Sequence, residues 1–108
     1  MVARFLTLWR RNPMAPWPAD LGEYSKLVEK MWAIIDDLMK KGEITEFGFF
    51  LDGISGYAMG EGDSTVAFRD VNLFNPFYEF EVHEVIPYEK GKESLRALIK
   101  TQVETAKK

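Results

Sequence analysis

Along this chain, segments with the two-residue period of a β-strand alternate with segments that have the period of a helix. Few folds accommodate the order in which they occur. Strands are predicted at residues 2–9, 44–51, 55–61 and 77–86, and helices at residues 19–41, between Asp63 and Asn75, and at residues 92–107. The order is therefore strand, helix, strand, strand, helix, strand, followed by one more helix. This succession is the split βαβ, or ferredoxin-like, motif.

A four-stranded antiparallel sheet follows from this order, because right-handed crossovers place both main helices on one face of the sheet. The first and third strands are expected at its centre. The predicted fold class is α+β, of the ferredoxin-like type, and a chain of 108 residues fits one domain. Residues 1–90 are expected to form the core of that domain, and residues 91–108 its C-terminal helix.

Local signals mark several of the boundaries. Residues 12–18 contain three prolines and are therefore predicted to be a loop. The dipeptide Asp52-Gly53 is a strong hairpin signal between the second and third strands. In the third strand, Gly56, Ala58 and Gly60 share one face, which predicts that a neighbour approaches that face closely.

Composition excludes several classes of function. The chain has 17 acidic and 14 basic side chains and a net charge of -3, which argues against nucleic acid as the main partner. Binding to phosphates requires a concentrated basic face. The absence of cysteine excludes disulfides, thiolate metal sites and cysteine nucleophiles. No apolar run is long enough for a signal peptide or a transmembrane helix, so we expect no membrane partner and a cytoplasmic location.

Both faces of the predicted sheet carry apolar side chains, although two helices cover only one face. The opposing sets are Phe5 and Trp9 against Leu6 and Leu8, and Phe47, Phe49 and Leu51 against Ile44 and Phe50. Monomers rarely leave such a surface exposed. We therefore expect a homodimer, or a higher homo-oligomer, in which a second copy packs face to face by two-fold symmetry. The C-terminal helix is the rival cover, on its own sheet or on the partner's.

Three segments of the chain carry a family resemblance. They are Lys41-Gly42-Glu43, Ser55-Gly56-Tyr57-Ala58 and the acidic, aromatic run at residues 73–82. In these the chain resembles the dimeric α+β-barrel superfamily, in particular its muconolactone isomerase-like branch. The resemblance implies a dimeric barrel and a small-molecule enzyme, since the superfamily includes isomerases, cofactor-free monooxygenases and haem-binding enzymes. The chain departs from the pattern in its proline-rich loop and its C-terminal helix.

The fourth strand holds the candidate catalytic residues. Glu79, Glu81 and His83 share one face of it, which is expected to point away from the helices. Carboxylates and an imidazole that line an aromatic cavity can shuttle protons. The candidates for substrate binding are Arg4, Trp9, Arg10 and Tyr57. The alternative is that this polar face is a solvated sheet edge, where charged residues are normal.

Two functions from different classes are compatible with these residues. The first is a cofactor-independent isomerase or monooxygenase that acts on a small apolar, aromatic or lactone-like molecule. The second is a non-catalytic domain for ligand binding or assembly. An enclosed cavity reached by Glu81 and His83 would favour the enzyme. No cofactor is expected. No metal is expected either, because side chains two residues apart on a strand are about 6.6 Å apart and would not share one ion.

Overall fold

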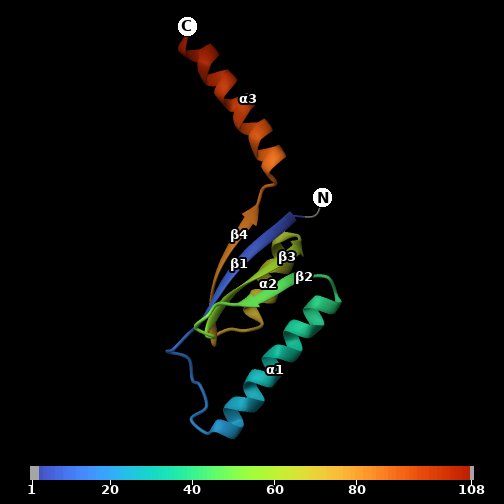
Figure 1. Cartoon of the computed structure of the whole chain (residues 1–108), viewed down its shortest axis with the longest axis vertical. Coiled ribbons are helices and arrows are strands. Elements are labelled where there is room, and N and C mark those ends of the chain that lie inside the picture. Colours follow the sequence, from blue (N-terminus) through green and yellow to red (C-terminus); the bar gives the residue numbers. More distant parts are fainter. Residues whose placement is uncertain (1–2, 108) are drawn as a thin grey trace.

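The structure of the protein is a computed structural model that describes residues 3–107 (Figure 1). Its elements are β1 (Ala3–Arg11), α1 (Leu21–Lys40), β2 (Ile44–Phe49), β3 (Ser55–Gly62), α2 (Ser64–Asn72), β4 (Tyr78–Val85) and α3 (Tyr88–Ala106). The predicted order of elements is confirmed, and the fold is α+β and ferredoxin-like with an additional C-terminal helix. Val2, where the first strand was predicted to begin, lies outside the described residues.

The four strands form one antiparallel sheet in the order β2-β3-β1-β4. The prediction that the first and third strands are central is therefore confirmed. β1 continues two residues beyond its predicted end at Trp9, because Arg11 still pairs with Tyr78 of β4. The Arg11 backbone N–H also donates to the Ile54 carbonyl at 2.8 Å. Backbone bonding to β4 on one side and to Ile54 on the other thus continues β1 beyond Trp9, its last apolar residue.

The helices α1 and α2 pack on the same face of the sheet, and the core lies between them and β1. Trp9 is its central side chain and is only 6% exposed. The Trp9 ring stacks on Phe47 at a centroid distance of 5.4 Å and meets Phe49 and Tyr78 edge-on at 5.5 and 5.6 Å. Phe5, Met31 and Leu38 complete the buried apolar set among the described residues.

The opposite face of the sheet, here called the open face, carries the alternate residues of each strand. Leu6 and Leu8 of β1 lie on it, and Tyr57 of β3 stands directly opposite Leu8. Ile44 was predicted to share this face with Phe50, and that prediction is wrong. The pairing of β2 is irregular between Ile44 and Glu46, which turns Ile44 to the helix-covered face, where it lines the core.

Close approach at Gly56 makes this position intolerant of a side chain, as the sequence predicted. A Cβ atom there would lie 2.1 Å from the Gly48 carbonyl oxygen and 2.5 Å from the Trp9 ring. We expect Gly56→Ala to lower the free energy of unfolding by about 3 kcal/mol, as overpacking typically does. Urea unfolding measures it. Gly91→Ala in α3 is the matched control, since its Cβ would meet only Ile86 at 3.6 Å; an equal loss in both variants would contradict the steric explanation.

The last helix, α3, projects away from the rest of the chain (Figure 1). The molecule measures 69 × 29 × 25 Å and has a radius of gyration of 19.0 Å, whereas a compact chain of this length has about 13 Å. α3 begins at Tyr88 rather than at the predicted Lys92. The earlier start follows from Pro87, whose carbonyl accepts the first helical bond, from the Gly91 N–H, at 2.9 Å.

Within residues 3–107, α1, α2 and α3 all lack an apolar stretch long enough to cross a bilayer.

Candidate functional site

A cavity of about 90 Å³ lies between the two packed helices and the sheet. Its walls are almost entirely apolar: Phe5, Trp9 and Phe47 line it from the sheet, Met31 and Ile35 from α1, and Val71 from α2. Ordinary ligand pockets have volumes of about 300–1,000 Å³, while an apolar cavity of about 150 Å³ takes up benzene. The lining of this cavity suits a small apolar molecule, but its volume is below both values, so a molecule of one ring enters only when the lining side chains move apart.

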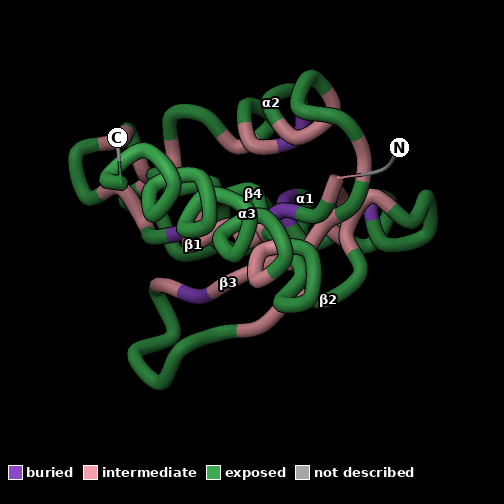
Figure 2. The backbone as a smooth tube through the Cα atoms, turned by 90° about the horizontal axis from the view of Figure 1, so that it is seen from above, coloured by how far each residue is buried: buried purple, intermediate pink, exposed green. Residues whose placement is uncertain are grey.

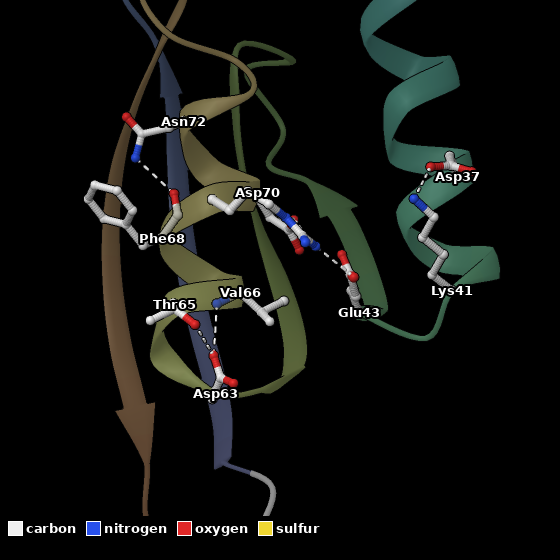
Figure 3. A network of polar contacts seen from close by, with 10 residues as sticks. Asp37, Lys41, Glu43, Asp63, Thr65, Val66, Phe68, Asp70 and Asn72 are labelled. Carbon is white, nitrogen blue, oxygen red and sulfur yellow. Dashed lines mark hydrogen bonds and ion pairs between the residues drawn. The ribbon is translucent and has the colours of Figure 1, made fainter.

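Four acidic residues line the cavity, and two of them, Glu43 and Asp70, lie close together between β2 and α2 (Figure 3). The other two are Glu61 and Asp63. Glu43 stands in the turn between α1 and β2, just after Gly42, whose φ of 78° requires glycine. The Glu43 N–H donates to the Leu38 carbonyl at 3.0 Å, which fixes the turn. Asp70 lies in the last turn of α2 and is 9% exposed.

The start of α2 aims Asp70 inward. The Asp63 carboxylate caps this helix by accepting the Val66 N–H at 3.0 Å. Val66 and Asp70 are four residues apart and therefore lie on the same side of α2. Since both of them line the cavity, the capped helix presents a carboxylate on its buried, apolar side.

A guanidinium neutralises part of the charge of this pair. Arg69 donates to the Glu43 Oε1 atom at 2.7 Å and to the Asp70 Oδ1 atom at 3.1 Å. The second carboxylate oxygen of Glu43, Oε2, is buried and has no hydrogen-bond partner. A buried acceptor of this kind is costly unless a donor reaches it. A protonated Asp70 supplies such a donor.

Asp70 is the group whose protonation changes near neutrality. Burial, and then the hydrogen bond with Glu43, raise the pKa of Asp70 to about 6. The hydrogen bonds from Asp70 and Arg69 hold the pKa of Glu43 below its ordinary value. The two carboxyl groups therefore share one proton below about pH 6, with Asp70 as the donor and Glu43 as the ionised acceptor.

Asp70 also reaches the outside of the molecule. It lines a groove between α1 and α2 together with Lys30, Lys41 and Arg69. The same side chain thus stands between the apolar cavity and a basic, solvent-accessible groove. A proton taken up from the cavity can leave by way of this groove, which is the arrangement that a general acid or base needs.

The residues predicted as catalytic lie on the open face and not in this cavity. The Nε2 atom of His83 is 3.4 Å from the Oε1 atom of Glu81, and both side chains are more than half exposed. Glu79 forms an ion pair with Arg10 at 2.7 Å. The structure brings these four residues together in two pairs, on the side of the sheet away from the cavity.

The remaining predicted residues divide between the two faces. Arg4 stands on the open face between Glu61 and Val85 in the strand register. The Tyr57 hydroxyl, also on this face, donates to the Glu46 carboxylate, and this bond raises the pKa of Tyr57. Trp9 lies on the opposite face, where it lines the cavity. Trp9 therefore does not lie with the other substrate-binding candidates.

Glu43, Asp70 and Arg69 were not among the predicted site residues, although the sequence contains a signal for Asp70. Val66 and Val71 form the apolar side of α2, and Asp70 falls on that same side at a helical spacing of four residues from Val66. A carboxylate there is exceptional, because charged residues are rarely buried. Glu43 carries no comparable signal, because its position depends on the turn after α1.

Comparisons with known proteins assign no family to this chain. A scan against protein-family models found no match. A search of curated proteins also found no significant match to the sequence.

Proposed function

We propose that this protein is a cofactor-independent enzyme that moves protons on a small apolar, aromatic or lactone-like molecule bound in the cavity. The observation that carries the proposal is the carboxyl pair of Glu43 and Asp70 at the end of an apolar cavity. General bases work best when their pKa lies near the operating pH. A pKa of about 6 gives Asp70 that property, which a surface aspartate lacks.

The isomerase form of this chemistry needs only one carboxyl group. The Asp70 carboxylate removes a proton from carbon next to a carbonyl group, and the resulting carboxylic acid returns that proton to another carbon of the same molecule. Electrons move only within the substrate, so no oxidant is required. Glu43 and Arg69 act as positioning residues, because they hold Asp70 through hydrogen bonds. The resemblance to the muconolactone isomerase-like branch, on residues 73–82, favours this substrate class over others.

A monooxygenase without a cofactor would use the same base. Asp70 would deprotonate an electron-rich phenolic substrate, and molecular oxygen would be the oxidant. The aromatic walls of the cavity, with Trp9 and Phe47 among them, suit a phenolic ring. Isomerase and monooxygenase activities are distinguished by whether product formation consumes oxygen.

We also propose that the protein is a homodimer. The chain exposes 8114 Å², whereas a folded monomer of 12.5 kDa exposes about 6,200 Å². The excess of about 1,900 Å² per chain is of the size that obligate dimers bury. This excess equally favours the second candidate function, a non-catalytic assembly domain, and ligand binding in the cavity separates the two.

The proposal is tested with phenol and a small unsaturated γ-lactone as probes. We expect both to shift the NMR signals of cavity residues in the wild-type protein. Ala67→Leu fills the cavity from α2 and should weaken binding at least tenfold, about 1.4 kcal/mol. Ala97→Leu, on the exposed surface of α3, should leave it unchanged.

Turnover is measured on the same probes by solvent deuterium exchange into the lactone and by oxygen uptake with the phenol. Asp70→Asn should retain binding and lose at least 100-fold of the exchange rate, since general-base catalysis contributes about that much. Binding without exchange or oxygen uptake in the wild-type protein would leave the ligand-binding function and overturn the enzyme. The absence of binding would overturn both the enzyme and the ligand-binding function and leave the assembly domain.

A further inference from the structure

The helix α3 carries an apolar stripe that no other part of residues 3–107 covers. Leu95, Leu98, Ile99 and Val103 recur at helical spacing and are 49–59% exposed. None of the residues of α3 is buried (Figure 2). In proteins most of the stability of a helix comes from packing of its apolar side rather than from intrinsic propensity. The stripe therefore requires a partner surface.

The charges around the stripe are asymmetric. On one border lie Lys92, Arg96 and Lys100, together with Glu89, which pairs with Lys92 at 3.2 Å. Ser94, Thr101 and Thr105 occupy the other border. Residues 88–108 carry six basic and three acidic side chains, while residues 1–87 carry eight basic and 14 acidic ones. The helix is thus basic and the domain from which it projects is acidic.

The open face of the sheet has the complementary pattern. Leu6 and Leu8 form its apolar centre on β1. Four carboxylates surround this centre and outnumber the two arginines of the same face, Arg4 and Arg10, of which Arg10 is paired with Glu79. The carboxylates are Glu46, Glu61, Glu79 and Glu81. An apolar strip between carboxylates matches an apolar stripe with a basic border. α3, at 19 residues and about 28 Å, is also about as long as the strands of eight residues, at about 26 Å.

The exposed area that the chain has in excess of a folded monomer is too large for the open face alone or for the α3 stripe alone. The open face spans four strands of about 26 Å at spacings of about 4.8 Å, so its plane measures roughly 500 Å². That plane is well below the excess of about 1,900 Å² per chain. Burial of the open face and of the α3 stripe in one interface accounts for more of the excess than either surface alone.

We infer that α3 packs its apolar stripe on the open face of a second copy of this chain, and that the second copy does the same in return. The chain's own open face is the poorer partner. Only Ile86 and Pro87 separate β4 from α3, and they direct the helix away from the sheet (Figure 1). This inference rests on the homodimer proposed above and is independent of the ligand in the cavity.

The experiment mixes isotope-labelled and unlabelled copies of the full chain and joins amines to carboxylates with a zero-length carbodiimide crosslinker. We expect crosslinked peptides of hybrid isotope composition that join Lys92 or Lys100 of α3 to Glu79 or Glu81 of the other copy. If the crosslinked peptides of these residues are all fully labelled or fully unlabelled, α3 lies on the sheet of its own chain. That result would overturn the inference.

Two variants with matched chemistry complete the test by sedimentation equilibrium. Leu95→Glu combined with Ile99→Glu places two charges in the stripe and should raise the dimer dissociation constant at least 100-fold. Ala97→Glu, on the opposite side of α3, should change the dissociation constant less than threefold. Since α3 projects away from the other described elements (Figure 1), both variants should retain the domain's circular dichroism and its probe binding.

Two further results of the sedimentation experiments would contradict different parts of this account. A stripe variant that dimerises like the wild type would overturn the role of α3 and leave a dimer held by the sheets alone. A wild-type chain that sediments as a monomer at micromolar concentration would overturn the homodimer and this inference together. Neither result bears on proton transfer by Asp70, which lies on the other side of the sheet.

Discussion

Replacement of Trp9 by alanine is expected to remove about 3–5 kcal/mol from the free energy of unfolding, the usual cost of deleting a buried tryptophan. Trp9 is 6% exposed and contacts Phe47, Phe49 and Tyr78 through its ring. Its Nε1 atom also donates to the Tyr57 carbonyl at 3.4 Å. Domains of this size are stable by only about 5–15 kcal/mol, so the variant should be close to its unfolding threshold.

Urea unfolding at a fixed protomer concentration measures this effect, because dimerisation makes apparent stability depend on concentration. Trp32→Ala is the matched control. Trp32 also lines the cavity, but its side chain is 46% exposed on α1, and we expect a loss below about 1.5 kcal/mol. Equal losses in the two variants would contradict the placement of the core at Trp9.

Asp70→Asn is expected to make the protein more stable above neutral pH. The pKa of Asp70 is raised from 3.8 to about 6 in the folded chain. A group with a raised folded pKa contributes stability that is complete below its unfolded pKa and is lost as the pH rises through its folded pKa. The wild type should therefore lose up to about 3 kcal/mol between about pH 4 and pH 8, a loss that the asparagine variant avoids.

Thermal unfolding of both proteins across this pH range provides the measurement. The two curves should coincide below about pH 4, apart from a constant offset from the altered bond to Arg69. They should diverge as the pH rises from about 4 to about 6 and keep a constant separation above about pH 7. Asp37→Asn is the control, because Asp37 and its partner Lys41 are 58% exposed; such a pair is worth little. A pH-independent difference between Asp70→Asn and the wild type would show that Asp70 ionises normally.

The order of elements and the sheet topology were predictable, because they depend on periodicity and chain punctuation that are local in the sequence. The long helix illustrates this. Its cap at Asp20 and its end before Gly42 are visible as residue types. The start of α3 was predicted four residues late, since Gly91 interrupts the helical pattern there without interrupting the helix itself.

The site was less predictable for a different reason. The parity of β4 correctly placed Glu79, Glu81 and His83 on one face, but strand parity does not show where a cavity forms. The cavity depends on how closely α1 and α2 approach the sheet, which is a property of packing between distant segments. Glu43 and Asp70 are 27 residues apart in the chain and meet only because of that packing.

The most direct test of the proposed chemistry is a carboxyl-carbon NMR titration of Asp70 in the wild type and in Glu43→Gln. We predict a pKa of about 6 in the wild type. In the variant the pKa should fall toward its ordinary value, because the charge and the acceptor of Glu43 are removed. A wild-type Asp70 that titrates near 3.9, as exposed aspartates do, would contradict the shared proton and with it the assignment of Asp70 as the base.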